Sequence, residues 1–92
     1  MELYFEWDEE KAKTNLNKHG VSFETAAKVF FDQNRIEIYD EAHSHGDEDR
    51  FITIGMAGEV LFVVYIERQP NIRLISARLA TARERRLYYG IV

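Results

Sequence analysis

Three apolar segments separated by short turn sequences constrain the fold of this chain more than any other feature. They cover residues 51–56, 60–66 and 72–78, with Ala57-Gly58-Glu59 after the first and Gln69-Pro70-Asn71 after the second. Glycine and proline favour tight turns, and tight turns join antiparallel neighbours. The pattern therefore predicts a three-stranded antiparallel meander in the second half of the chain.

The beginning of the chain carries the signals of a strand followed by a helix. Residues 3–7 are rich in aromatic side chains, and Asp8 after them is a good helix N-cap. Residues 9–19 are dense in helix formers, and Gly20 follows where a C-terminal cap is expected. The first helix is therefore predicted to stop at Gly20.

Two further helices have recognisable N-termini. Ser22 can cap a helix over residues 23–31, where apolar side chains recur at helical spacing. Thr81 and Glu84 form a capping-box pattern, which predicts a last helix over residues 82–89.

A further short strand, at an edge of the sheet, is predicted over residues 35–39. The order of elements is then β-α-α-β-β-β-β-α. This is an α+β fold, with two N-terminal helices packed on an antiparallel sheet and a C-terminal helix. Ninety-two residues suffice for a modest core, so residues 1–92 are expected to form a single domain.

The composition excludes several classes of protein. The chain has no cysteine, which excludes disulfides and thiolate metal sites. No apolar run is long enough to span a bilayer, and the N-terminus lacks the pattern of a secretory signal. We expect a cytoplasmic protein that has no contact with a membrane.

The charge is strongly polarised along the chain. Residues 50–92 hold seven arginines, no lysine and three acidic residues, whereas residues 1–49 hold thirteen acidic and five basic residues. A guanidinium group fits two oxygens of a phosphate, so an arginine-only basic half indicates a defined anion site. The isoelectric point near 5.3 argues against a protein that coats nucleic acid.

Strand alternation sorts these arginines. Arg50, Arg68 and Arg78 each lie at the end of an apolar strand face, where desolvated charges can converge. Alternation along the last strand places Arg78 with residues 72, 74 and 76 and turns Arg73 to the other side. The alternative is that each arginine forms an ordinary ion pair at the rim of the sheet, with Glu48, Asp49 or Glu67 as partners.

Other charged residues have structural interpretations that compete with functional ones. Arg83, Arg85 and Arg86 would form a solvated face of the last helix, or extend the anion site. His43 and His45 lie in a polar loop over residues 40–49, which offers metal ligands without a fixed geometry.

Several short segments, taken together, point to a known family. They are Phe5-Glu6-Trp7-Asp8, Lys11, Asn15, Lys18-His19-Gly20-Val21-Ser22-Phe23-Glu24, Asp47-Glu48-Asp49-Arg50, Val63-Val64-Tyr65-Ile66-Glu67-Arg68, Ile75-Ser76-Ala77-Arg78 and Glu84-Arg85. In this order and spacing they resemble the BrnT family of bacterial toxins, and the resemblance covers nearly the whole chain. The family is similar in fold to the RelE ribonuclease toxins.

The resemblance implies a metal-independent endoribonuclease, without a cofactor, that inhibits translation by cleaving RNA. The ribose 2′-hydroxyl would attack the adjacent phosphate, and Arg50, Arg68 and Arg78 suit the role of stabilising the charge that develops. Glu67 or Glu48 is a candidate general base, although neighbouring arginines weaken a carboxylate in this role. Candidate groups for contact with RNA or proton transfer are Lys18, His19, Tyr65 and Arg83.

The resemblance also implies a partner. The family is encoded beside BrnA, a ribbon-helix-helix antitoxin that binds the toxin and operator DNA, so the toxin would meet DNA only through its antitoxin. The chain departs from the family pattern at Ile66, where threonine is usual, and at Leu79, where a basic residue is usual. Either change would reduce activity or alter the choice of RNA.

Two other functions fit the same residues. A catalytically inactive interaction module would bind its DNA-binding partner for autoregulation, and a small metal-dependent hydrolase would use His43 and His45. Convergence of Arg50, Arg68 and Arg78 around one phosphate-sized space would favour the ribonuclease, and a dispersed arrangement the interaction module.

Overall fold

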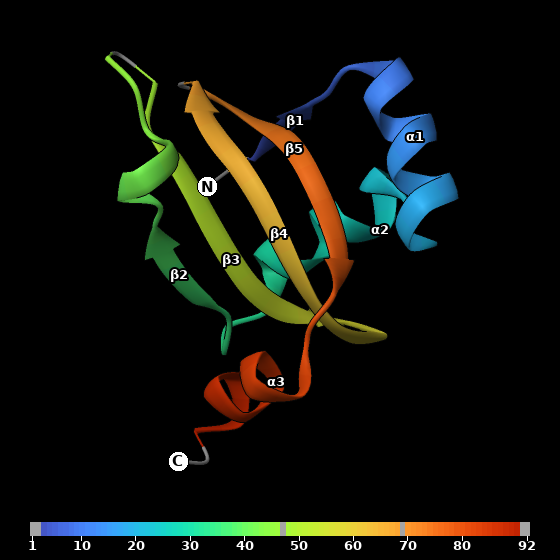
Figure 1. Cartoon of the computed structure of the whole chain (residues 1–92), viewed down its shortest axis with the longest axis vertical. Coiled ribbons are helices and arrows are strands. Elements are labelled where there is room, and N and C mark those ends of the chain that lie inside the picture. Colours follow the sequence, from blue (N-terminus) through green and yellow to red (C-terminus); the bar gives the residue numbers. More distant parts are fainter. Residues whose placement is uncertain (1–2, 47, 69, 91–92) are drawn as a thin grey trace.

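A five-stranded sheet with strand order β1-β5-β4-β3-β2 organises the computed structural model, which describes residues 3–46, 48–68 and 70–90 (Figure 1). The predicted order β-α-α-β-β-β-β-α is confirmed. The elements are β1 (Tyr4–Glu6), α1 (Glu9–His19), α2 (Phe23–Ala27), β2 (Ile36–Tyr39), β3 (Arg50–Ala57), β4 (Glu59–Arg68), β5 (Asn71–Leu79) and α3 (Ala82–Tyr89).

The predicted meander is confirmed, since β3, β4 and β5 pair antiparallel in chain order and β2 forms an edge. Gln69, part of the predicted second turn, lies outside the described residues. The sequence did not predict that β1 pairs parallel with β5, with Tyr4 opposite Asn71. The second predicted helix is α-helical only in its first half, and a 3₁₀ turn over Lys28–Phe31 completes it.

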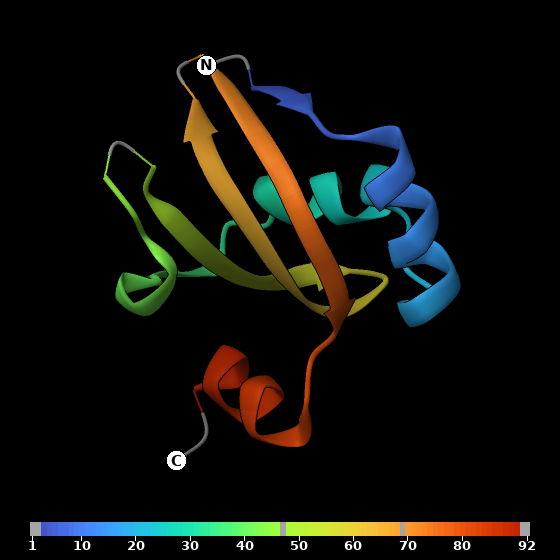
Figure 2. The ribbon, with the colours of Figure 1, turned by 45° about the horizontal axis from the view of Figure 1, so that its top comes forward.

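One face of the sheet is covered by α1 and α2, and this helix face carries the main core (Figure 2). Phe23, Ala26 and Val29 are fully buried against it. Removal of apolar side chains from water is the main force that holds the helices to the sheet. Across the described residues, no helix has both the length and the apolar character needed to cross a membrane.

The opposite face of the sheet is called the open face below. An irregularity in β5 places Arg73 on this face. Ser76 pairs with Val64 and Leu74 with Tyr65, so Ile75 has no partner on β4. Such a bulge resets the alternation of side chains. The predicted alternation is therefore wrong before the bulge: Ile72 and Leu74 lie on the helix face, and Arg73 shares the open face with Arg78.

α3 covers one end of the open face. A smaller apolar cluster of Ile54, Val60 and Ala80 lies there, and Tyr88 of α3 packs against it. The predicted capping box of Thr81 and Glu84 is present at the start of this helix. Toward the other end of the open face, the 3₁₀ turn Glu41–His43 lies beside the start of β3 (Figure 1).

A single buried side chain joins α1 to the edge of β5. Asn15 Nδ2 donates to the carbonyl oxygens of Val21 and Ala77, at 3.0 and 2.8 Å, and Asn15 Oδ1 accepts from the Ala77 amide at 3.1 Å. β1 pairs only with residues 71–73 of β5. Further along the same edge, the backbone of Ala77 is hydrogen-bonded to this helix side chain instead of to a strand. Asn15 satisfies three buried backbone groups that water does not reach.

Candidate functional site

Four arginines lie on the open face, in two groups at different ends of it. Arg50 and Arg73 are both paired with Ile66 across the sheet, and Arg68 lies two residues further along β4. Arg78 is paired with Phe62, near the beginning of β4. Arg50, Arg68 and Arg78 therefore do not converge on one phosphate-sized space, which is the arrangement expected of an interaction module.

Arg78 is held rigidly by the protein itself. Its two terminal nitrogens donate to the two oxygens of Glu84, at 2.8 and 3.0 Å, and its guanidinium lies 3.9 Å from the centre of the Phe62 ring. A bidentate pair combined with a cation–π contact fixes both the side chain and α3, which carries Glu84. Arg78 is therefore best described as the link between β5 and α3.

Glu84 makes this link sensitive to acid. The Arg78 hydrogen bonds, with the Thr81 amide, hold the pKa of Glu84 below its usual range, and hydrogen bonds from Asn71 and Arg73 do the same for Glu6. A carboxylate whose pKa is lowered on folding contributes stability that is present at neutral pH. That stability is lost as pH falls from the ordinary carboxylate range through the lowered pKa.

We expect Glu84→Gln to have a lower melting temperature than the wild type at pH 7, with the difference shrinking steadily toward pH 3. Thermal unfolding followed by circular dichroism at each pH measures this. Glu59→Gln, an exposed residue at the start of β4, is the matched control and should follow the wild type throughout. A constant difference between Glu84→Gln and wild type would show that the carboxylate charge is unimportant.

Arg50 and Arg68 are held more loosely and share one partner. Their guanidinium nitrogens lie 3.7 and 3.9 Å from oxygens of Glu48, and Arg68 is 4.0 Å from Glu6. These distances exceed those of charge-assisted hydrogen bonds. Arg50 Nε is buried and has no hydrogen-bond partner among the described residues. The terminal nitrogens of Arg50, whose side chain is 28% exposed, are therefore the donors that an anionic ligand can reach.

A hollow of about 360 Å³, called the arginine hollow below, opens beside Arg50 on the open face. Its floor is apolar and its rim is polar, which is typical of a ligand site. Its lining residues are Asp40, His43, Arg50, Ile52, Phe62, Val64, Ile75 and Ser76.

The rim of the arginine hollow is ordered, contrary to the expectation of a loop without fixed geometry. Residues Glu41–His43 form a 3₁₀ turn. Ser44 Oγ donates to the Asp40 carbonyl at 2.8 Å and accepts from the Arg50 amide at 2.9 Å, and the Asp40 amide donates to the Arg50 carbonyl at 2.8 Å. These bonds join the loop to the first residue of β3.

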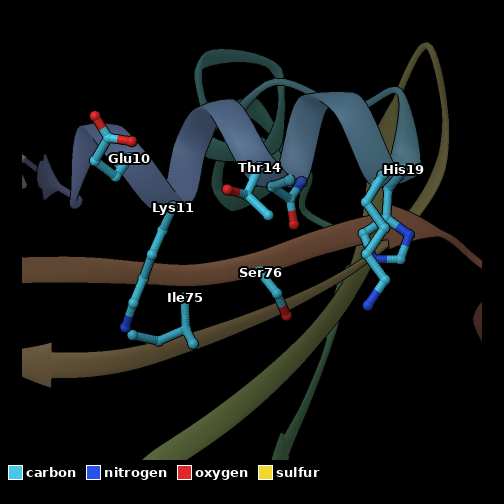
Figure 3. Close-up of a pocket in the computed structure, with 8 residues that line it drawn as sticks. Glu10, Lys11, Thr14, His19, Ile75 and Ser76 are labelled. Carbon is cyan, nitrogen blue, oxygen red and sulfur yellow. The ribbon is translucent and has the colours of Figure 1, made fainter.

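A second hollow, of about 300 Å³, lies between α1 and β5 and is called the lysine hollow below. Figure 3 shows Lys11 and His19 extending from α1 toward β5, where Ile75 and Ser76 lie. Ile75 and Ser76 line both hollows, so the two are neighbours across β5. The lining residues are Glu10, Lys11, Thr14, Asn15, Lys18, His19, Ile75 and Ser76.

The other predicted site residues are distributed over both faces. Lys18 and His19 line the lysine hollow, and Arg83 is exposed on α3. Glu67 is paired with Ile72, a residue of the helix face, and so lies on the other side of the sheet from Arg50.

Tyr65 belongs to the core rather than to the surface. It is only 1% exposed, and its ring stacks on Phe51 and makes an edge-to-face contact with Phe30. Burial raises the pKa of its phenol, and the carboxylates of Glu37 and Glu67 add to this. A direct contact between Tyr65 and RNA is therefore not available in this structure.

Two residues of the arginine hollow were not predicted as a functional pair. His43 Nδ1 lies 3.0 and 2.9 Å from the two carboxylate oxygens of Asp40. A signal was present, since Asp40 and His43 are three residues apart and one turn of helix brings such residues together. Within the described ranges, His, Asp and Glu form no group of three or more arranged to hold a metal ion.

The fold and this face define a class of protein: a small α+β domain with α1 and α2 on one sheet face and an arginine-lined hollow on the other. Residues 7–84 match the model of a family described as "Ribonuclease toxin, BrnT, of type II toxin-antitoxin system". The chain therefore belongs to the BrnT family of ribonuclease toxins. Membership in a type II toxin–antitoxin family implies an RNA substrate and an antitoxin partner.

A solved structure agrees in fold. The 1.1 Å crystal structure of the Brucella abortus ribonuclease toxin, BrnT, superimposes with a TM-score of 0.67. It shares 24% sequence identity, and the match covers 87% of this chain and 99% of that chain. No curated protein sequence matches the chain.

Proposed function

We propose that this protein is a metal-independent endoribonuclease that cleaves RNA on the open face and thereby inhibits translation. The separate position of Arg78 would by itself favour the interaction module, but the match to a ribonuclease toxin family outweighs it. The observation that carries the proposal is Arg50, which lines a hollow with an apolar floor and has its terminal nitrogen as far as 3.7 Å from Glu48. Attack of a ribose 2′-hydroxyl on the adjacent phosphate places additional negative charge on the phosphate oxygens. A guanidinium already positioned beside them stabilises that charge without reorganisation.

The loose ion pairs around Glu48 suit an exchange of partners. A phosphate in the arginine hollow offers Arg50 shorter hydrogen bonds than the 3.7 Å contact with Glu48. Arg68 lies 3.9 Å from the other oxygen of Glu48. Once Arg50 has turned to the phosphate, Arg68 either pairs with Glu48 alone or contacts a neighbouring phosphate. Glu48 thus keeps two arginines close together in the free protein.

The two hollows suggest the path of the RNA. A strand that crosses β5 at Ser76 would have one phosphate beside Arg50 and a flanking phosphate near Lys11, Lys18 and His19. Single-stranded RNA fits this path, since its bases are free to pack on an apolar floor such as that formed by Phe62 and Val64. In a double helix the bases are paired and stacked inside, so they could not pack on this floor.

The proposal extends to the partner and the organisation of the protein. We propose a BrnA-like ribbon-helix-helix antitoxin that covers the basic open face with acidic residues, since such residues would complement Arg50 and Arg68. Operator DNA would be reached only through that antitoxin. The chain would act as a single RelE-like domain in the cytoplasm.

Cleavage of a purified single-stranded RNA in the presence of EDTA tests the proposal. We expect wild-type protein to cut the RNA and to leave a 2′,3′-cyclic phosphate and a 5′-hydroxyl. A fully 2′-O-methylated strand of the same sequence should stay intact, because its nucleophile is blocked. Well-folded protein that leaves RNA uncut, with and without added divalent metal and ribosomes, would instead support the catalytically inactive interaction module.

A further inference from the structure

An exposed histidine, held by a partly buried carboxylate, stands at the rim of the arginine hollow. The His43 side chain is 66% exposed and the Asp40 side chain only 16%. A carboxylate at neutral pH only accepts hydrogen bonds, so the 2.9 Å contact places a proton on His43 Nδ1. The lone pair of the neutral ring then lies on Nε2, the nitrogen that Asp40 does not use.

We propose that His43 is the general base of RNA cleavage and that Asp40 is its positioning residue, an inference that rests on the function proposed above. Neutral His43 takes the proton of the 2′-hydroxyl through Nε2 while the 2′-oxygen forms a bond to phosphorus. The bond from phosphorus to the 5′-oxygen breaks, and the leaving oxygen takes a proton from water. His43 afterwards releases its proton to solvent, which restores the starting state.

The surroundings of His43 suit this role. Asp40 is the carboxylate that stabilises the protonated ring, and Arg50 is the cation that shares the hollow. β4 and β5 contribute only uncharged side chains there, among them Phe62 and Ser76. Since Ser44 bonds both the Asp40 carbonyl and the Arg50 amide, the base and the proposed phosphate-binding group are held by one short segment.

Glu48 and Glu67, the general bases considered from the sequence, are less suited than His43 to accept the proton. Glu48 lies between Arg50 and Arg68 and is not among the residues that line the arginine hollow. Glu67 is paired with Ile72 and lies on the helix face. The histidine pair is therefore the proton acceptor that shares the hollow with Arg50.

The test is the pH dependence of single-turnover RNA cleavage by wild type, His43→Gln and Asp40→Asn. We expect His43→Gln to be slower by a factor of about 100 and to lose the rise in rate with pH that titration of an imidazole produces. Asp40→Asn should lower the rate less than His43→Gln does and should retain that rise, since the base is still present but loses the carboxylate that orients its ring. Both variants should bind the 2′-O-methylated strand as tightly as wild type.

The control is His45→Gln, a second exposed histidine of the same loop, which should keep the wild-type rate and profile. A His43→Gln protein that cuts within a factor of about three of wild type, with the same profile, would overturn the assignment. If Glu48→Gln, and not His43→Gln, loses the rise in cleavage rate with pH, the general base is Glu48. Failure of wild type itself to cut RNA would reject the proposed function, and the role of His43 with it.

Discussion

Replacing Arg50 with alanine is expected to slow RNA cleavage by roughly 10²- to 10³-fold, the usual loss when one preorganised donor to a developing oxyanion is removed. Arg50 carries this expectation because it lines the arginine hollow and its terminal nitrogen is 3.7 Å from Glu48, too far for a strong hydrogen bond. Single-turnover cleavage with excess protein measures the effect, since it separates chemistry from product release. The melting temperature should change little, because the 3.7 Å contact with Glu48 is weak.

Two further variants make the Arg50 result specific. Arg50→Lys keeps the charge but loses the planar fork, so it should recover only part of the activity. Arg86→Ala removes an arginine from the exposed side of α3 and should cut RNA at the wild-type rate. Equal losses in Arg50→Ala and Arg86→Ala would indicate that only the overall charge matters.

Replacing Asn15 with alanine is expected to be the most destabilising of these substitutions. Its side chain makes three hydrogen bonds to buried backbone groups of Val21 and Ala77, and alanine would leave all three groups without partners. A buried group that loses its partner costs about 1 to 3 kcal/mol, so a total of roughly 3 kcal/mol is a conservative expectation. For a domain of this size that corresponds to a fall of about 12 to 24 °C in Tm.

Urea unfolding and thermal unfolding of Asn15→Ala measure this loss. Asn17→Ala, on the exposed side of the same helix, is the matched control and should lie within about 0.5 kcal/mol of wild type. A small effect in Asn15→Ala would mean that water reaches Ala77 and replaces the lost bonds. The hydrogen bonds of Asn15 would then not be needed to keep water away from this edge of β5.

Local signals were sufficient to predict most of the fold. Gly58 and Pro70 separated the three strands of the meander, and Asp8 and Gly20 marked the ends of α1 as observed. These features depend on a few neighbouring residues, and each has a clear physical cause in turn or cap geometry. The capping box of α3 belongs to the same category.

The features that local signals did not reveal depend on contacts between distant segments. Pairing of β1 with β5 leaves no trace in a three-residue strand. The bulge at Ile75 interrupts an apparently regular alternation, which is why Arg73 was assigned to the wrong face. Alternation also gives no distance along the sheet, so it did not show that Arg78 lies apart from Arg50 and Arg68.

In the candidate site, too, local features were predicted from the sequence and contacts between distant segments were not. Arg50 was expected from the sequence as a charge-stabilising residue, and the structure places it in a hollow. The link between Asp40 and His43 was missed because the loop was read as irregular, whereas Ser44 joins it to β3. Hydrogen bonds from a loop to a distant strand are invisible to periodicity.

The parallel pairing of β1 with β5 also bears on how the protein is made. Residues near the N-terminus, which leave the ribosome first, are paired with residues 71–73, which leave it late. The hydrogen bond from Arg73 to Glu6 therefore cannot form until Arg73 has been synthesised, and α3 is synthesised later still. Because such distant pairing forms only when both segments are present, a growing chain does not complete its open face before most of the protein has been translated.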